Sequence, residues 1–210
     1  MKLLSPAEIS ESSTKAEQPG SVIKILDGAI RAIADVGTRR LSMSDISDAS
    51  GVSRGTLYRY FSSKDEVLAA VSEFVCAGFE NGIRSVGNGI ADPIERLRAV
   101  MRFHAEFTRE RSPQRIFEVE PAFHLDFFRS HFERHMAALS DALDPVLDYL
   151  ESQLRMTINR SGFVETLLRL QLSTLIVPAS SAWEEQWNQA PDALQTWALK
   201  LAGQQGRKTT

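Results

Sequence analysis

Apolar residues recur at helical spacing along most of this chain. Between residues 22 and 33 they fall at every third or fourth position, and charged residues occupy the opposite face. This pattern predicts an amphipathic helix. No segment shows the alternating apolar and polar positions, bounded by hairpin turns, that indicate β-strands. The sequence therefore predicts an all-α fold.

Further helices are predicted from the same spacing and from its interruptions. Asp92-Pro93 is typical of a helix start, with Pro in the first helical position. A long helical stretch begins near Leu125, and Pro145 is expected to kink or break it. The remaining helices are expected over residues 43–50, 54–61, 64–87, 163–181 and 192–202. Residues 1–20 and 204–210 are predicted to be mobile tails.

The overall charge hides a difference between the two ends of the chain. The 210 residues carry a net charge of −3, which argues against a general nucleic-acid binder. Residues 1–64, however, hold nine Lys and Arg against seven Asp and Glu, whereas the rest holds fifteen against twenty. A small basic section on an acidic body suggests a local anion-binding surface.

Composition also excludes several kinds of protein. With 43 % apolar residues the chain can bury a sizeable core. It shows neither the apolar run of a signal peptide nor an apolar stretch of membrane-spanning length, so we expect a cytoplasmic protein without membrane contact. The single cysteine rules out an internal disulfide and a cysteine-built zinc site. We expect no cofactor.

Residues 42–61 have the punctuation of a helix-turn-helix. Ser42 and Asp45 fit a capping box at the start of one short helix. Gly51 can supply the left-handed residue that ends this helix, and Ser53 can cap the next. Two short helices with a glycine turn between them match the helix-turn-helix motif in length and capping.

The exposed positions of the second helix have chemistry that suits DNA. Arginine can pair with the O6 and N7 atoms of guanine, and threonine can offer a hydroxyl or a methyl group to a base edge. Tyrosine hydroxyls and lysine can reach phosphate oxygens. Gly55 would allow the backbone to approach DNA closely, and Ser63-Lys64 begins the next helix with N–H groups and a positive charge.

These residues resemble a known family. The segments ILDGAIRAIADVG and LSMSDISDASGVSRGTLYRYFSSKDEVL, within about residues 22–70, are similar to the DNA-binding region of TetR-family transcriptional regulators. The resemblance implies a helix-turn-helix domain over residues 21–66 and a helical ligand-binding and dimerisation domain over residues 67–203. It also implies a homodimer formed mainly by the last two helices.

The resemblance also implies which residues face DNA. Tyr58 and Lys64 stand where phosphate contacts are expected, whereas Arg54 and Arg59 stand at variable positions that suit base contacts. Against this, a surface arginine is usually only solvated, and Tyr60 could be half in the core. The full implied set is Ser42, Ser44, Arg54, Thr56, Tyr58, Arg59, Tyr60 and Lys64.

Seven of the eleven phenylalanines fall between residues 103 and 132. Each could simply pack in the core. A concentration of aromatic residues also suits the apolar wall of a ligand pocket. We therefore hypothesise a large apolar or acyl ligand that contacts Met101, Phe103, Phe107 and Phe128.

The region after residue 162 is more apolar than one amphipathic face requires. It could pack on the chain's own body or form the contact with a second copy. The expected dimer contacts are Leu168, Leu172, Leu175 and Trp197. His131 and His135 lie one helical turn apart and could chelate a metal, but exposed imidazoles on an amphipathic helix are the preferred interpretation, so we expect no metal site.

The sequence thus favours a ligand-responsive transcriptional regulator. We expect a repressor that leaves a palindromic operator when a small, hydrophobic ligand binds. An activator, or a DNA-binding protein of the same fold without ligand control, remains the alternative. No nucleotide-binding loop, GxSxG motif or metal-ligand set supports an enzyme. The effector and the operator sequence are left open.

Overall fold

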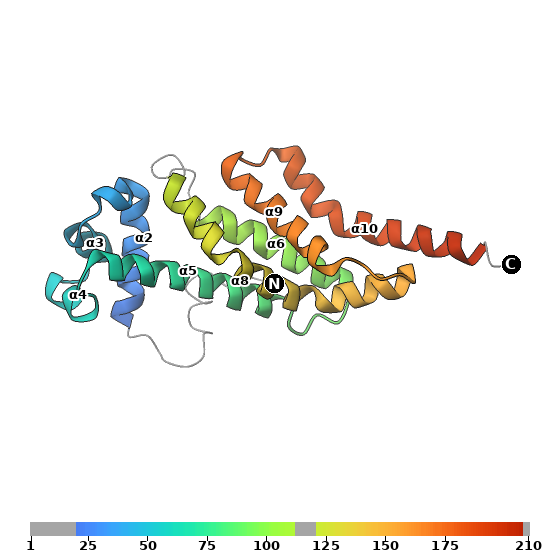
Figure 1. Cartoon of the computed structure of the whole chain (residues 1–210), viewed down its shortest axis with the longest axis horizontal. Coiled ribbons are helices and arrows are strands. Elements are labelled where there is room, and N and C mark those ends of the chain that lie inside the picture. The colour runs from blue at the N-terminus through green and yellow to red at the C-terminus, as the bar shows by residue number, and fades with distance from the viewer. Residues whose placement is uncertain (1–19, 112–120, 208–210) are drawn as a thin grey trace. The chain divides into compact units, whose positions relative to one another are not determined.

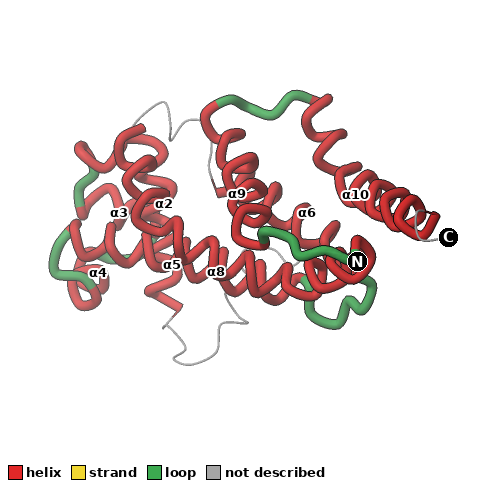
Figure 2. Tube along the Cα trace, turned by 45° about the vertical axis from the view of Figure 1, so that its right-hand side comes forward, coloured by secondary structure: helices red, strands yellow, loops and turns green. Residues whose placement is uncertain are grey.

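The computed structural model describes residues 20–111 and 121–207. Within these ranges the chain forms α-helices and no β-strand, which confirms the predicted all-α class (Figures 1 and 2). The predicted N-terminal tail lies outside the described residues except for Gly20, which begins the first helix. None of the helices described is both long and apolar enough to cross a membrane.

The chain divides into two compact units. The first, here called the N-terminal unit, contains residues 20–81 and 121–132 of the described chain. The second, here called the helical body, contains residues 82–111 and 133–207. The predicted boundary between residues 66 and 67 stays a prediction.

The N-terminal unit is built on four helices close together in the sequence. Its second and third helices, with their caps, lie where the sequence predicts them. The first one is interrupted at Gly37, whose φ of 74° and ψ of 160° are not helical. The helices are α2 (Gly20–Arg40), α3 (Met43–Ser50), α4 (Arg54–Tyr60) and the first part of α5 (Lys64–Val86).

One apolar core holds these helices together. Helical spacing places the apolar residues of each helix on its inner face, where burial of a large side chain stabilises the fold by about 1.5–3 kcal/mol. Ile46 of α3 and Leu57 of α4 are both fully buried, so the two short helices are anchored side by side. The other buried members are Ile25, Leu26, Ala29, Ala32, Ile33, Leu41, Val67 and Val71.

The helical body packs around α6. Asp92 caps this helix by accepting from the N–H groups of Ile94 and Glu95 at 2.8 and 2.9 Å, which confirms the predicted start at Asp92-Pro93. Helix α6 packs against α9 and α10. The body's helices are α6 (Pro93–Arg111), α8 (Pro121–Leu154) from residue 133 onwards, α9 (Arg160–Ile176) and α10 (Ser181–Arg207).

Polar bonds fix the packing of α6 at two places. Trp187 of α10 is buried and its indole N–H donates to the carbonyl of Met101 at 3.0 Å. Near the start of α6, Arg98 donates to Asp192 of α10 at 2.7 Å. The pKa of the Asp192 carboxyl is lowered chiefly by this hydrogen bond. A buried indole needs such a partner, so Trp187 holds α10 in one register on α6.

Three predicted helix limits in the body are wrong. Helix α8 continues through Pro145, so a break there is wrong and a kink stays a prediction; Pro145 is exposed, and the buried Val146 and Leu147 beside it keep the helix in the core. Helix α9 ends at Ile176, two residues before Pro178, rather than at residue 181. Helix α10 begins at Ser181, passes through Pro191 and reaches Arg207, and the rest of the predicted tail lies outside the described residues.

Candidate nucleic-acid interface

The turn between α3 and α4 is fixed by its own backbone and hydroxyl groups. Gly51 ends α3 with φ 66° and ψ 17°, the left-handed conformation that glycine adopts without strain. Ser47 donates to the carbonyl of Val52 at 2.7 Å across the turn. The Ser53 hydroxyl accepts from the Thr56 N–H at 3.2 Å and so caps α4. The two helices therefore form the helix-turn-helix that the sequence predicts.

Ser42 and Asp45 close the predicted capping box at the start of α3. The Asp45 carboxylate accepts from the Ser42 N–H at 2.8 Å and from its hydroxyl at 2.7 Å, and the Asp45 N–H returns a bond to that hydroxyl at 3.3 Å. The Ser42 hydroxyl bond is the main reason that the pKa of Asp45 is lowered. Ser42 is thus already engaged within the chain, although it remains exposed.

The central contact of the interface joins the two helices. The guanidinium of Arg54, at the start of α4, donates to the hydroxyl of Ser44 on α3. Sequence reasoning singles out both residues but does not link them, because they lie ten positions apart. The contact positions a flexible arginine at the exposed edge of the motif. An arginine held in this way loses less side-chain freedom when it binds a base.

Other predicted residues of α4 differ in exposure. Tyr58 is 53 % exposed and free to meet a partner, whereas Thr56 is half-buried with its hydroxyl 3.0 Å from that of Ser53. Tyr60 is half-buried against the core, as the competing interpretation holds. Arg59 lies over the Tyr60 ring, 4.9 Å from its centre, and donates to its hydroxyl at 3.3 Å.

Lys64 has a bond that the sequence does not reveal. Its ammonium group donates to the Thr38 carbonyl at 3.0 Å and so ties the start of α5 to the end of α2. Next to it, the Glu66 carboxylate accepts from the N–H and hydroxyl of Ser62 at 2.7 and 2.8 Å, and these bonds lower the pKa of Glu66. The Ser63 hydroxyl caps α5 by accepting from the Glu66 N–H at 3.2 Å. A phosphate contact by Lys64 stays a prediction.

Sequence reasoning also missed two residues of α2 that hold the motif. Arg31 reaches the carbonyl of Ala49, at the end of α3, at 2.7 Å. Gly28 lies directly against the backbone of Ser50. The spacing of apolar residues in α2 placed Arg31 on the solvent-facing side. It gave no sign that Arg31 contacts Ala49. Both contacts orient α3, and through the turn they orient α4.

Comparison with known proteins bears directly on this geometry. The model of the family described as bacterial regulatory proteins, tetR family, matches residues 25–71, the region that holds the helix-turn-helix. In this N-terminal region, the chain is similar to the TetR family. The HTH-type transcriptional regulator BetI of Rhizobium meliloti is 32 % identical over 78 residues. That alignment spans 37 % of this chain and only 38 % of the relative.

Solved structures are similar in fold over most of the chain. The fatty acid degradation regulator FadR from Bacillus halodurans has a TM-score of 0.58 at 20 % identity, covering 88 % of this chain and 97 % of its own. AibR, solved in complex with isovaleryl coenzyme A and operator DNA, has a TM-score of 0.56 at 22 % identity, covering 81 % and 95 %. At such identities the likeness shows the fold.

The predicted ligand residues of this chain fall in both units. Met101 and Phe103 on α6 are buried, and Phe107 is half-buried with its ring 5.6 Å from that of Phe103. The Phe103 ring packs directly on the backbone of Gly82. Phe128 belongs to the N-terminal unit, where its ring lies 5.4 Å from that of Phe127. A shared ligand site stays a prediction.

Histidines in the chain are engaged in different ways. His131 bonds to the Phe127 carbonyl through Nδ1 at 2.8 Å and packs its ring on the Phe127 ring. In the body, His104 and His135 are both buried. Burial, with a smaller effect of the nearby His135, lowers the pKa of His104 to about 3. Among the described residues, no group of three or more potential ligands is placed to hold a metal.

The predicted dimer residues of the helical body have unequal access to solvent. Trp197 on α10 is 52 % exposed, and Leu172 and Leu175 on α9 are half-buried. Leu168 is 1 % exposed and lies in the body's own core, which leaves it no surface for a partner. Several other apolar residues of these two helices, and of the segment that connects them, are exposed. The predicted set of dimer contacts does not include them. These are Leu170, Ile176, Val177 and Leu199.

Proposed function

We propose that this chain is a TetR-like regulator of transcription that binds a palindromic DNA operator as a homodimer. The observation that carries the proposal is the Arg54–Ser44 contact on the exposed edge of a helix-turn-helix. A surface arginine that is only solvated needs no such anchor. The printed names of BetI and FadR, both regulators, and the operator DNA in the AibR structure support the same function. Work on chromosomal DNA would place the protein in the cytoplasm.

Within this proposal, residues of α4 divide into two roles. Arg54 and Arg59 read bases, because a guanidinium can pair with guanine through two bonds. Tyr58 binds a phosphate oxygen, since its side chain is 53 % exposed and its hydroxyl can donate to phosphate. Ser42, Ser44, Thr56, Tyr60 and Lys64 support the same surface through the contacts described above.

A single short helix reads only a few base pairs, so the proposal includes a second copy of the chain. A two-fold dimer presents two such helices to half-sites about one helical turn, or 34–36 Å, apart. We place the dimer contact on α9 and α10, with Trp197 at its centre. Support comes from the apolar side chains that this region leaves exposed, among them Ile176 at 67 % and Val177 at 70 %. Exposed apolar patches mark interaction surfaces.

The dimer can be tested by measuring the molar mass of the purified protein in solution. Replacing Trp197 with Glu places a charge in the proposed contact and should shift the mass from dimer to monomer. The control is Leu125→Glu, which alters an exposed leucine of α8 outside the proposed contact. A Trp197→Glu protein that remains a dimer would remove Trp197 from the interface.

The proposed effector is a small apolar molecule, with an acyl chain or acyl coenzyme A ester as the first class to test. The buried Met101 and Phe103 and the half-buried Phe107 supply apolar surface on α6. The printed titles of the similar structures name a fatty acid degradation regulator and an isovaleryl coenzyme A complex, which supports the acyl class. Release of DNA requires that the ligand binds the two states of the protein with different affinity.

A thermal-shift screen of fatty acids, acyl coenzyme A esters, sterols and aromatic compounds tests the effector. A class that raises the melting temperature is then added to the DNA complex. Release of the DNA supports a repressor, whereas tighter binding favours the alternative, an activator. No response to any apolar class supports the other alternative, a DNA-binding protein of the same fold without ligand control.

Footprinting on the DNA that flanks the chain's own gene, over a series of salt concentrations, tests the function itself. The expected result is a two-fold symmetric protected site with half-sites about one helical turn apart. Arg54→Ala should weaken this protection, so that more protein is needed for it, whereas Arg102→Gln, which alters an exposed arginine of α6, should retain it. If only diffuse, salt-sensitive binding appears, selection from genomic fragments follows. A selection without any sequence preference would overturn the proposal.

A further inference from the structure

Two neighbouring arginines at the end of α2, Arg39 and Arg40, have no role in the interface described so far. Both are exposed, and neither guanidinium has a hydrogen bond or ion pair with another described residue. Four other basic side chains of the N-terminal unit differ in this respect. Arg31, Arg54, Arg59 and Lys64 all donate to groups of the same unit.

The backbone that carries this arginine pair is held in place on both sides. After the non-helical Gly37, the Leu41 N–H bonds back to the Gly37 carbonyl at 3.0 Å. The Thr38 carbonyl accepts from Lys64 at 3.0 Å. Thr38 and Leu41 are buried, at 9 % and 3 % exposure. The arginines lie between these two buried residues and point outward from a fixed segment.

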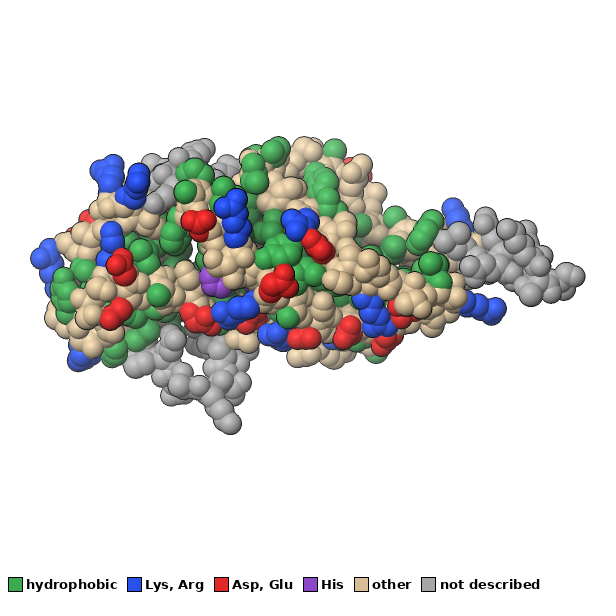
Figure 3. All heavy atoms as spheres, viewed as in Figure 1, with side chains coloured by type: hydrophobic (Ala, Val, Ile, Leu, Met, Phe, Trp, Pro, Cys, Tyr) green, Lys and Arg blue, Asp and Glu red, His purple; other side chains and the backbone are tan. Residues whose placement is uncertain are grey.

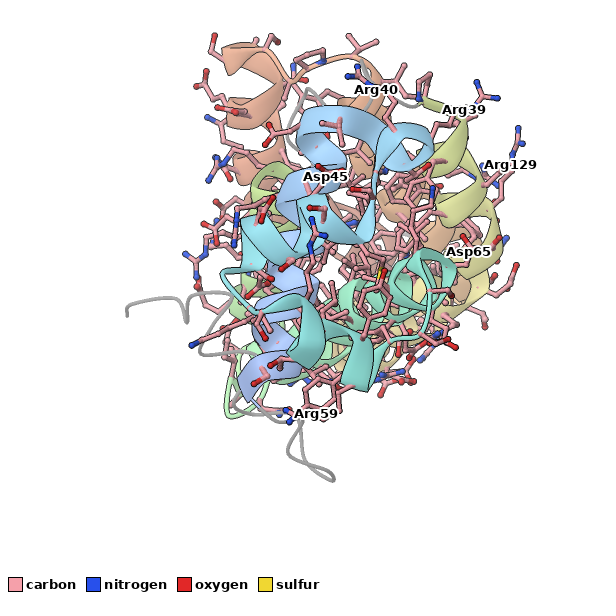
Figure 4. The ribbon with its side chains drawn as sticks, turned by 90° about the vertical axis from the view of Figure 1, so that its left-hand side faces the viewer. Arg39, Arg40, Asp45, Arg59, Asp65 and Arg129 are labelled. Atoms are coloured by element: carbon pink, nitrogen blue, oxygen red, sulfur yellow. The ribbon has the colours of Figure 1, made fainter. Side chains whose placement is uncertain are left out.

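The arginine pair lies beside the predicted DNA surface. Arg40 is close enough to α3 for its charge to contribute to the lowered pKa of Asp45, the residue that follows Ser44. Figure 4 shows Arg39 and Arg40 together at one edge of the face formed by α3 and α4, with Arg59 at the opposite edge and Asp45 between them. Blue side chains stand around the margin of the same end of the molecule in Figure 3.

We propose that Arg39 and Arg40 extend the DNA surface beyond the helix-turn-helix by binding backbone phosphates. This inference rests on the proposed function. Phosphate contacts need accessible cations and no base-specific geometry, which fits two exposed guanidinium groups on a fixed backbone. Arg40 also offsets the negative charge of Asp45, which would otherwise repel a phosphate at the start of α3. The pair thus adds affinity without adding sequence preference.

The test measures affinity against salt concentration for two duplexes of equal length, the operator fragment obtained by footprinting or selection and a random sequence. Each phosphate contact contributes about 0.9 to the slope of log K against log salt. In the proposed homodimer, Arg39→Gln with Arg40→Gln removes four phosphate contacts and should therefore make the slope shallower by about 3.6 on both duplexes. Between 50 and 200 mM salt, the advantage of the unaltered protein should shrink about 150-fold.

Two control proteins separate charge from fold and from position. Arg39→Lys with Arg40→Lys keeps both charges and should keep the slope. Arg102→Gln removes one exposed charge from α6 and should leave the slope unchanged. Ethylation of individual operator phosphates should locate the contacts, because some ethylated positions should weaken the unaltered protein and not the double Gln variant.

The outcomes distinguish this inference from the function on which it rests. A double Gln variant with an unchanged slope and an unchanged ethylation pattern would overturn the inference, while the unaltered protein still bound its operator. A loss confined to the operator, with normal binding of random DNA, would show base contacts and would also overturn it. An unaltered protein that binds neither duplex would contradict the proposed function itself.

Discussion

Gly28 of α2 packs against the backbone of Ser50, the last residue of α3. A Cβ atom at position 28 would lie 2.5 Å from the Ser50 Cα, closer than packed atoms approach. Three residues further along α2, Arg31 donates to the carbonyl of Ala49. The two contacts hold the end of α3, and with it the turn at Gly51, against α2. The orientation of the helix-turn-helix therefore depends on a residue without a side chain.

Gly28→Ala should destabilise the N-terminal unit by about 1–3 kcal/mol, because backbone atoms cannot move aside as a flexible side chain can. The measurement is amide hydrogen exchange of residues 43–50, which should become faster. The control is Gly55→Ala on α4, where a Cβ meets nothing within 4 Å and helix propensity should rise. Equal protection of α3 in both variants would contradict the prediction.

The sequence predicts the helix-turn-helix well because its signals are local. The capping residues Ser42 and Ser53 and the left-handed Gly51 each act within a few positions, and the structure confirms all three. The long helix that begins at Lys64 also agrees with prediction. Such signals depend on backbone groups near in sequence, which a single sequence displays.

Contacts between helices could not be predicted in the same way. The bonds from Lys64 to Thr38 and from Arg31 to Ala49 join residues 26 and 18 positions apart. Nothing in spacing shows which carbonyl a long side chain will reach. Leu168 fails as a dimer residue for a related reason, since an apolar helix side looks the same whether it meets its own body or a partner.

Replacing Ser44 with Ala should reduce the preference of the protein for its operator over random DNA. The change removes the hydroxyl that holds Arg54, so the guanidinium becomes more mobile before it meets a base. Arg54→Ala should reduce this preference more than Ser44→Ala does, by about 1–3 kcal/mol between the operator and random DNA. Arg54→Lys separates the roles, because it keeps the charge without the two-bond geometry. If the Lys variant discriminates as well as the unaltered protein, Arg54 is a phosphate contact.

Arg59→Ala should weaken binding to the operator more than binding to random DNA. The Arg59 side chain must leave the Tyr60 ring, or move together with it, to reach a base edge. Tyr60→Phe keeps the ring and removes the hydroxyl that accepts from Arg59, so its effect should be smaller than that of Arg59→Ala. Equal losses on both duplexes for Arg59→Ala would make Arg59 a phosphate contact instead.

The capping box of α3 should weaken in acid. The Ser42 hydroxyl and N–H donate to the Asp45 carboxylate and lower its folded-state pKa below the ordinary value of 3.8. Ionised Asp45 therefore stabilises the fold above that pH. This contribution is lost as the pH falls through the folded-state pKa. Ser42→Ala, which costs about 1 kcal/mol at neutral pH, should therefore cost less near pH 3. Amide hydrogen exchange of residues 43–50 measures the cost of Ser42→Ala at each pH. A cost that stays constant with pH would contradict the prediction.

Stability of the helical body should fall between pH 6.5 and about 3 because of His104, whose folded-state pKa burial lowers to about 3. The unfolded chain binds a proton at His104 from about pH 6.5 downwards, whereas the folded chain resists it, so stability is lost as the pH falls through this window.

All three tryptophans lie in the body, so their fluorescence during urea unfolding follows its stability. His104→Gln should lose less stability than the unaltered protein between pH 7 and pH 4.5. His131→Gln, the control in the N-terminal unit, should follow the unaltered protein. Parallel curves for His104→Gln and the unaltered protein would show that His104 does not set the acid sensitivity of the body.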